Sequence, residues 1–160
     1  MAMFEDDESF GFEDEDFDPE EANQEWQQER ARVANMPIML KAREILDTVD
    51  SLTELMEEDA GMAHYRDILF EDASMICSKI AGAESRELYS LRMENAVIIK
   101  IHARSLLTQV SGLAMMGFKE KHYLEVLREE IEEFRVLFIE WVEGFDKSND
   151  IPDNWGVLFR

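Results

Sequence analysis

The chain has 160 residues, of which 37 are acidic and 16 are Lys or Arg, so its formal net charge is −21 at pH 7. The length fits one domain with a hydrophobic core, and seven Gly and three Pro are few for a turn-rich all-β fold. A single Cys excludes a disulfide framework and a four-thiolate metal site, and the negative charge opposes binding to nucleic acid or to an anionic membrane.

Residues 1–18 are an acidic head that precedes the first predicted helix. Residues 1–29 hold 13 acidic side chains and no Lys or Arg, and like charges at this density resist compaction, so we predict a disordered head. The acids are interrupted by Phe4, Phe10, Phe12 and Phe17. A tail that only improves solubility does not need these rings, whereas exposed aromatic groups among acids are typical of docking peptides. Both interpretations, a solubilising tail and a docking segment, stay open.

The body of the chain, residues 19–146, has the apolar periodicity of helices and no run with period two. A helix start is indicated by Asp18-Pro19-Glu20-Glu21, and the polar helix that it opens runs to about Val33. Apolar steps of three and four predict further helices over residues 38–56, 62–80, 86–116 and 124–145. A break is predicted from Gly82 to Ser85, with Ser85 as the cap of the next helix. Residues 147–160 are predicted to form a C-terminal tail, and the sequence leaves open whether this tail packs on the helices or extends away from them.

Short breaks between helices favour antiparallel neighbours. We therefore predict an all-α fold, an up-down-up-down four-helix bundle with an additional N-terminal helix and the disordered acidic head. The last two bundle helices are predicted to be longer than the first two and to overhang them around residues 107–127. This overhang holds a candidate apolar interface formed by Leu113, Met115, Met116 and Phe118. Cover for it could come from the helix around Trp26, from the tail around Trp155, or from a second copy in a homodimer.

The sequence contains no convincing motif for a metal or a cofactor. No His has a Glu three residues before it, as the inward-facing ligands of di-iron bundles require. EF-hand spacing is present at Asp14, Asp16, Asp18 and Glu25, but the position that needs a glycine with positive φ is Pro19, which cannot adopt that angle. We therefore expect no metal site and no cofactor.

One spacing is similar to a motif of MazG-type all-α nucleotide pyrophosphohydrolases, which hold Mg²⁺ with Glu-x-x-Glu and Glu-x-x-Asp on two facing helices. This chain has Glu129-x-x-Glu132 and Glu143-x-x-Asp146. The resemblance implies a metal-dependent nucleotide hydrolase. Both pairs fall on one predicted helix, however, where they are about 16 Å apart and cannot share an ion unless the helix breaks.

Three polar residues at seven-residue intervals, Asn95, His102 and Gln109, share one stripe of the helix predicted over residues 86–116. They border its apolar face, where polar groups need hydrogen-bond partners. The stripe predicts either a structural network that fixes helix register or a polar groove for a ligand or a partner helix.

The sequence favours a non-enzymatic interaction or scaffold protein, because the acidic head is prominent and a catalytic set is missing. The expected partner is a protein, most simply a basic one, and neither nucleic acid nor a membrane is expected as a partner. No apolar run approaches the ~18 residues of a membrane span, and the acidic N-terminus does not resemble a signal peptide, so we expect a cytoplasmic protein. Two alternatives stay open: a metal-dependent, MazG-like nucleotide hydrolase, and an acidic mimic of nucleic acid that sequesters a basic protein.

Overall fold

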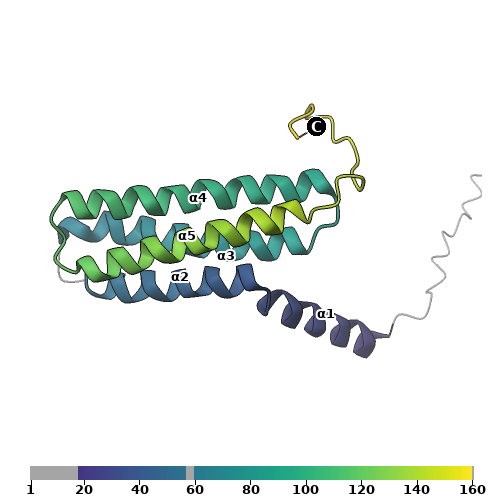
Figure 1. The fold of residues 1–160 in the computed structure, drawn as a ribbon. Coiled ribbons are helices and arrows are strands. Elements are labelled where there is room, and N and C mark those ends of the chain that lie inside the picture. The colour runs from purple at the N-terminus through teal and green to yellow at the C-terminus, as the bar shows by residue number, and fades with distance from the viewer. Residues whose placement is uncertain (1–17, 57–59, 160) are drawn as a thin grey trace, which may run out of the picture. The chain divides into compact units, whose positions relative to one another are not determined.

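The computed structural model describes residues 18–56 and 60–159. The chain divides into two compact units, Met1–Arg32 and Val33–Arg160. The described residues form five α-helices and a short 3-10 helix without any strand, which confirms the predicted all-α fold (Figure 1). No helix in this described part combines the length and the apolar character of a membrane-spanning segment. Residues 1–17 of the acidic head lie outside the described residues, so its disorder stays a prediction.

Helix α1 (Pro19–Ala34) begins where the sequence predicts it. Asp18 Oδ1 accepts a hydrogen bond of 2.9 Å from the Glu20 N–H, and Pro19 occupies the first helical position, where no N–H is needed. Farther along α1, the Arg30 guanidinium lies 4.6 Å from the centroid of the Trp26 ring. A cation over an indole face is a favourable contact within this helix.

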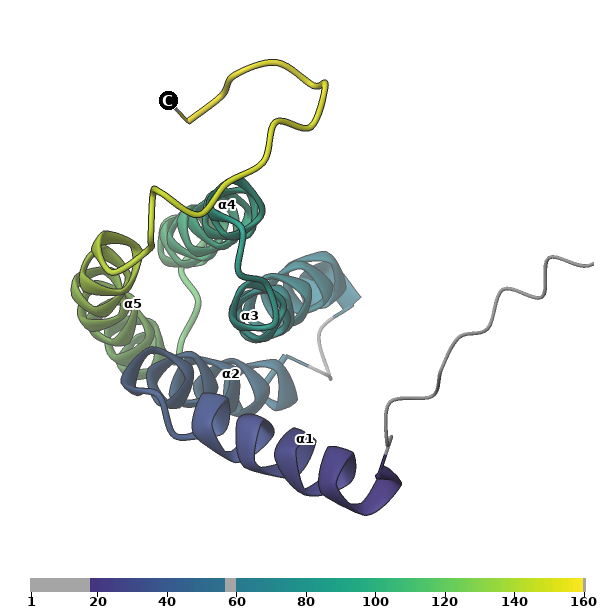
Figure 2. The same ribbon diagram turned by 90° about the vertical axis from the view of Figure 1, so that its right-hand side faces the viewer.

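The second unit contains the helices α2 (Pro37–Glu54), α3 (Ala63–Glu84), α4 (Tyr89–Met115) and α5 (Lys121–Glu143), with the short 3-10 helix η1 at Ala60–Met62. Views at right angles show α2 to α5 side by side around one interior (Figures 1 and 2). Helix α3 packs on α2 and α4, and α5 packs on the same two helices. These four helices are referred to below as the helical core.

The predicted apolar stripes fill this helical core. In α2 and the turn after it, the whole stripe is buried: Ile38, Ala42, Ile45, Val49, Leu52 and Met56. In α5 the buried part comprises Leu124, Leu127, Ile131 and Phe134. Side chains three and four residues apart lie on one face of a helix, which is why the spacing identifies the core side.

The connection between α3 and α4 differs from the prediction. Helix α3 continues through Gly82 to Glu84, and α4 begins at Tyr89 rather than near Arg86. A Cβ at position 82 would lie 3.2 Å from Asn95 Oδ1 in α4. The glycine inside α3 therefore allows the two helices to approach each other closely. The predicted cap, Ser85, instead donates its hydroxyl to the Gly82 carbonyl at 2.8 Å.

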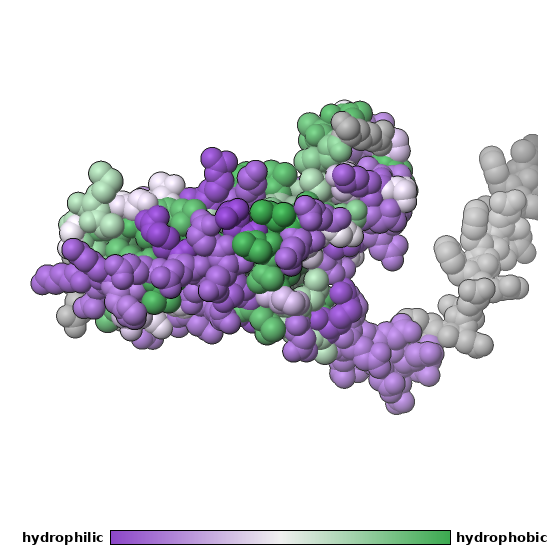
Figure 3. Space-filling model, in the orientation of Figure 1, coloured by the Kyte–Doolittle hydropathy of each residue, from purple (hydrophilic) through white to green (hydrophobic). Residues whose placement is uncertain are grey.

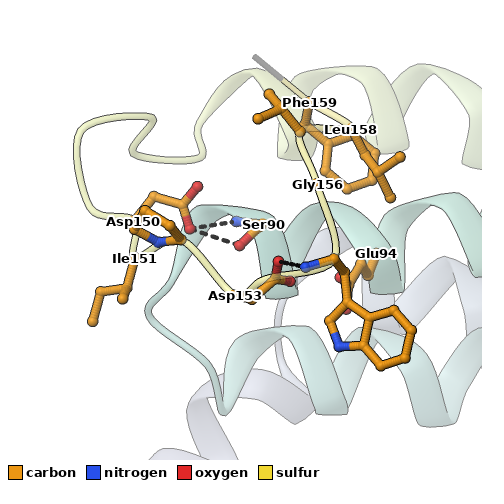
Figure 4. Close-up of a pocket in the computed structure, with 11 residues that line it drawn as sticks. Ser90, Glu94, Asp150, Ile151, Asp153, Gly156, Leu158 and Phe159 are labelled. Carbon is orange, nitrogen blue, oxygen red and sulfur yellow. Dashed lines mark hydrogen bonds between the residues drawn. The ribbon is translucent and has the colours of Figure 1, made fainter.

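The first turn of α4 is capped by the segment that follows α5. Asp150 Oδ1 accepts hydrogen bonds from the N–H and the hydroxyl of Ser90, at 3.2 and 2.6 Å (Figure 4). The Asn149 carbonyl accepts a further bond of 2.8 Å from the Tyr89 N–H. A carboxylate at this place also stabilises the positive end of the helix dipole. The C-terminal segment is thereby attached to the start of α4, far along that helix from residues 113–116.

Three helices are joined by one buried carboxylate at the end of the core near the start of α4. Glu84 Oε1 in α3 accepts a hydrogen bond from Arg92 Nη2 in α4 and a second, of 2.8 Å, from Trp141 Nε1 in α5. The Arg92 guanidinium also lies 4.2 Å from the centroid of the Phe145 ring. These contacts close the α4–α5 seam at this end.

Candidate functional site

An apolar groove of about 310 Å³ lies between α4 and α5. Its size falls at the lower end of the range of ligand pockets, ~300–1,000 Å³. Helical spacing brings one face of each helix to it. The apolar part is formed by Ala103, Leu107, Ile131, Phe134, Phe138 and Ile139, and the charged part by Lys100, Arg104, Glu132 and Arg135. The groove can therefore accept apolar groups that carry negative charge beside them.

The charge of the groove is opposite to that of the whole chain. Glu132 is the single carboxylate of the lining, and its Oε2 atom accepts a hydrogen bond of 2.9 Å from Arg135 Nε. Neither Lys100 nor Arg104 has an ion pair with a carboxylate of residues 18–56 or 60–159. Two cations thus stay available to a ligand in a chain of net charge −21.

Exposed apolar side chains also lie on both helices that form the groove. Val97 and Ile101 of α4 are 40% and 58% exposed, and Val136 and Ile139 of α5 are 49% and 44% exposed. Figure 3 shows hydrophobic residues at the surface over α4 and α5, among many hydrophilic ones. Single exposed apolar residues are ordinary, but a contiguous group of them marks an interaction surface.

The predicted polar stripe of α4 lies on the side of α3. His102 Nδ1 is 2.7 Å from Asp72 Oδ1, and Asn95 lies against Gly82 while its amide donates to the Leu91 carbonyl at 2.9 Å. Gln109 is half-buried. His102 and Asn95 therefore contribute to the contact between α3 and α4, and the stripe lines neither side of the α4–α5 groove. Asn95 also lines a hollow of about 460 Å³ between α3 and α4, so a polar groove at the stripe stays a prediction.

The partner of His102, Asp72, is a residue that the sequence analysis missed. It is 4% exposed, and its Oδ2 atom is buried without a hydrogen bond to any residue in the described ranges. A buried carboxylate is costly unless it is paired, so the Asp72–His102 contact fixes how α3 and α4 align. A signal was present, since Asp72 directly precedes Ala73 within the apolar stripe of α3, where an acid is unexpected.

The four residues of the predicted apolar interface separate in the structure. Leu113 and Phe118 belong to the core, with 0% and 9% exposure, whereas Met115 and Met116 are 89% and 54% exposed. Gly117, with a φ of 76°, turns the chain after α4, and the Phe118 N–H donates to the Leu113 carbonyl at 3.0 Å. This is a Schellman motif, which brings Phe118 back onto the helix that it follows.

Three of the four carboxylates of the nucleotide-hydrolase spacing lie along one continuous helix. Glu129, Glu132 and Glu143 belong to α5, and Asp146 follows it. Glu132 is paired with Arg135, and Asp146 accepts a hydrogen bond of 2.6 Å from the Ser148 hydroxyl. Within residues 18–56 and 60–159, no group of His, Cys, Asp or Glu side chains is arranged to hold a metal ion.

A half-buried carboxylate lies where α2 meets α5. The Thr48 hydroxyl donates to Glu130 Oε1 at 2.8 Å. Burial raises the pKa of Glu130, and the Thr48 hydrogen bond opposes this change only in part. Nearby, Lys41 of α2 pairs with Glu133 and Glu44, and the hydrogen bonds to these carboxylates raise the pKa of Lys41.

Cys77, the single cysteine, packs against the helical core. Burial raises the pKa of the Cys77 thiol, whereas a reactive cysteine needs a lowered pKa. Its environment is that of a structural thiol.

The cavity under the C-terminal segment is small. It lies between α4 and residues 150–159, with Ser90 and Glu94 on its helical side (Figure 4). Its volume of about 30 Å³ corresponds to roughly one water molecule. This cavity serves the attachment of the segment rather than the binding of a ligand.

The four phenylalanines of the head, Phe4, Phe10, Phe12 and Phe17, lie outside the described residues, and their docking role stays a prediction.

Comparison of the chain with protein-family models, with curated proteins and with solved structures gives no match. The fold and the groove define a class of protein by structure: an all-α protein whose acidic chain carries an apolar groove with a positively charged rim.

Proposed function

We propose that this protein is a non-enzymatic interaction or scaffold protein of the cytoplasm, in which a helical bundle presents binding surfaces and the acidic head docks a basic protein. The observation that carries the proposal is the exposed apolar side chains of α4 and α5: Val97, Ile101, Val136 and Ile139 are all at least 40% exposed, and Ile139 also lines the groove. Exposed apolar groups that adjoin a concave surface are typical of protein–protein contacts.

The proposed architecture is an up-down-up-down four-helix bundle with α1 as an additional helix. The order of helix contacts supports it, because α2, α3, α4 and α5 each pack on their neighbours in the chain and α5 also packs on α2. A bundle of this kind is rigid, so it holds its surface residues in a fixed arrangement for a partner.

The proposed docking of a basic partner is supported by charge. The 13 acidic residues among residues 1–29 attract a basic surface over several ångströms, and the phenylalanines between them supply apolar contacts once the partner is close. Binding of this kind weakens as salt concentration rises.

The test compares the full chain with a variant in which Phe4, Phe10, Phe12 and Phe17 are all replaced by Ala. Proteins retained from native lysate by the full chain are purified and titrated against both forms by calorimetry. We expect a basic partner whose affinity falls at least about tenfold in the variant and falls further with salt. Phe70→Ala, at a residue of α3 that is 51% exposed, is the matched control and should bind like the unchanged chain.

Equal affinity of the head variant and the unchanged chain would contradict the docking role of the head. Turnover of a nucleotide by the purified chain with Mg²⁺ would overturn the non-enzymatic proposal and favour the hydrolase alternative.

A further inference from the structure

The α4–α5 groove has an apolar floor and a charged rim. Ile131 and Phe134 are buried and form the floor, and the half-buried Leu107 and Phe138 also line it. The charged residues of the lining are all exposed: Lys100, Arg104, Glu132 and Arg135. The groove thus separates an apolar interior from charged groups at its entrance, which suits a molecule with an apolar chain and a charged headgroup.

The charged rim favours a negative headgroup. Glu132 accepts a hydrogen bond from Arg135, so these two charges offset each other. Lys100 and Arg104 lie one turn apart on α4, and neither has an ion pair with a carboxylate of residues 18–56 or 60–159. A ligand carboxylate beside them would accept charge-assisted hydrogen bonds, and a guanidinium can donate two parallel bonds to its two oxygens. A cationic headgroup would find only Glu132, which Arg135 already occupies.

The size of the groove limits the length of the apolar chain. Its volume of about 310 Å³ equals the liquid volume of roughly ten water molecules, each of which is about as large as a methylene group. The lining covers residues 100–107 and 131–139, or about 10–12 Å along the helices. Beyond this stretch, Arg128 Nη2 donates to Ser111 Oγ across the same seam at 3.3 Å. An alkyl chain of about eight to ten carbon atoms fits both measures.

We propose that the α4–α5 groove binds the anion of a free medium-chain fatty acid, with the alkyl chain on the apolar floor and the carboxylate at Lys100 and Arg104. Burial of the chain supplies most of the affinity, and the two cations determine which headgroup is accepted. The inference goes beyond the proposed function, because a small-molecule site needs neither the acidic head nor a protein partner.

The test titrates the full chain with octanoate, decanoate and decylamine by calorimetry, below the concentrations at which these amphiphiles form micelles. We expect saturable binding of decanoate to a single site. Each added methylene should improve the affinity about threefold to fourfold, so decanoate should bind about tenfold more tightly than octanoate. Decylamine carries the same chain with the opposite charge and should bind at least about tenfold more weakly than decanoate.

Two double variants remove the same charge from two different hollows. Lys100→Gln with Arg104→Gln should weaken the binding of decanoate about fivefold or more, since each exposed charge contributes modestly. Lys79→Gln with Arg86→Gln is the matched control, because both residues line the hollow between α3 and α4, and it should leave the affinity unchanged. Ala103→Leu keeps both cations but fills part of the groove, and it should also weaken binding. Circular dichroism shows whether the helices are retained in each variant.

Nuclear Overhauser contacts locate the bound chain, and we expect them between decanoate and the methyl groups of Leu107, Ile131 and Ile139. Equal affinity for decanoate and decylamine, undiminished binding by the variant at Lys100 and Arg104, or contacts only outside the groove would each overturn the inference. A chain that binds no decanoate would also overturn it, and groove methyl groups in contact with a second copy would then assign the groove to a dimer.

None of these outcomes bears on the docking of a basic protein, since the head is unchanged and no protein partner is present in the experiment. Conversely, a head that never captures a basic protein would leave the binding of decanoate intact.

Discussion

Helix α4 has two neighbours, and it meets them in different ways. Towards α3 the helices approach closely at two glycines: a Cβ on Gly112 would lie 3.2 Å from the Tyr65 hydroxyl oxygen, and one on Gly82 equally close to Asn95. Gly82 and Asn95 also line a hollow of about 460 Å³ between these helices, which has several polar residues in its lining. Towards α5 it carries Lys100 and Arg104 and faces large aromatic rings. The α3–α4 contact is the most extensive in the helical core, and the α4–α5 contact is the least extensive of the four.

This difference teaches that the residues along a seam decide the character of the hollow beside it. Glycine allows the backbones of α3 and α4 to approach, and Lys79, Glu94 and Asn95 contribute polar groups to the hollow there. The same seam holds the contact of the buried Asp72 with the half-buried His102. Between α4 and α5 the lining is mostly apolar and includes Phe134 and Phe138.

The comparison can be tested first by truncating one isoleucine in the interior and one at the groove. Ile99 is 0% exposed and Ile139 is 44% exposed. Ile99→Ala leaves a cavity and should lower the free energy of unfolding by about 2–5 kcal/mol, whereas Ile139→Ala should cost less than about 1 kcal/mol. Urea denaturation measures both values. A large loss at Ile139 would show that this residue is covered in solution.

The seam between α3 and α4 can be tested by removing its polar pair. Asp72→Ala leaves the half-buried His102 without its partner, and His102→Ala leaves the buried Asp72 without its partner, so each should lower the free energy of unfolding by about 1–3 kcal/mol. The double variant should lose less than the sum, since both changes remove one contact. Asp67→Ala, at an exposed carboxylate of α3, should change stability by less than about 0.5 kcal/mol. Strictly additive losses would mean that the pair does not join the two helices.

The smallest effect is expected at the contact of α2 with α5. The extent of this contact lies between those of the α3–α4 and α4–α5 contacts. Because burial raises the pKa of Glu130, its contribution to stability is fully present below the ordinary Glu pKa of about 4.3 and is lost as pH rises through the raised value. Glu130→Gln should therefore stabilise the chain slightly at neutral pH, by less than about 1 kcal/mol, and not below about pH 4. Thermal unfolding across this pH range measures the change.

Glu129→Gln, at the exposed neighbouring position, is the control for that experiment and should show no such dependence. A gain from Glu130→Gln that persists in acid would contradict the assigned cause.

The helices were predictable because their signal is local. Steps of three and four place Ile38, Ile45 and Leu52 on one face whatever they later pack against, and these residues are buried. The ends of α3 and α4 were not predictable in the same way. Gly82 resembles a helix breaker in the sequence, and only the close approach of Asn95 explains why a glycine lies inside the helix. The cap of α4 comes from Asp150, which is far from Ser85 in the sequence and so gives no local signal.

The groove could not be located from the sequence, because its existence depends on the distance between two helices. Spacing places Leu107 and Phe138 on apolar faces, and both would equally suit a closed seam. A partial signal existed in the charges of α4, where Arg92, Lys100 and Arg104 outnumber the single acid Glu94 although the chain as a whole is acidic. The stripe at Asn95 and His102 drew attention to polar groups at a packing edge, and the structure places that edge on α3.

The cap of α4 has a consequence for the order in which the chain can be completed. Ser90 is synthesised 60 residues before Asp150, the carboxylate that satisfies its N–H. At about 5–20 residues per second, a ribosome needs several seconds to cover that interval. During this time α2, α3 and α4 can already associate, but the start of α4 frays because its capping group has not been made. The helix acquires its final N-terminal boundary only after α5 has been synthesised, so the last segment to appear completes one of the middle helices.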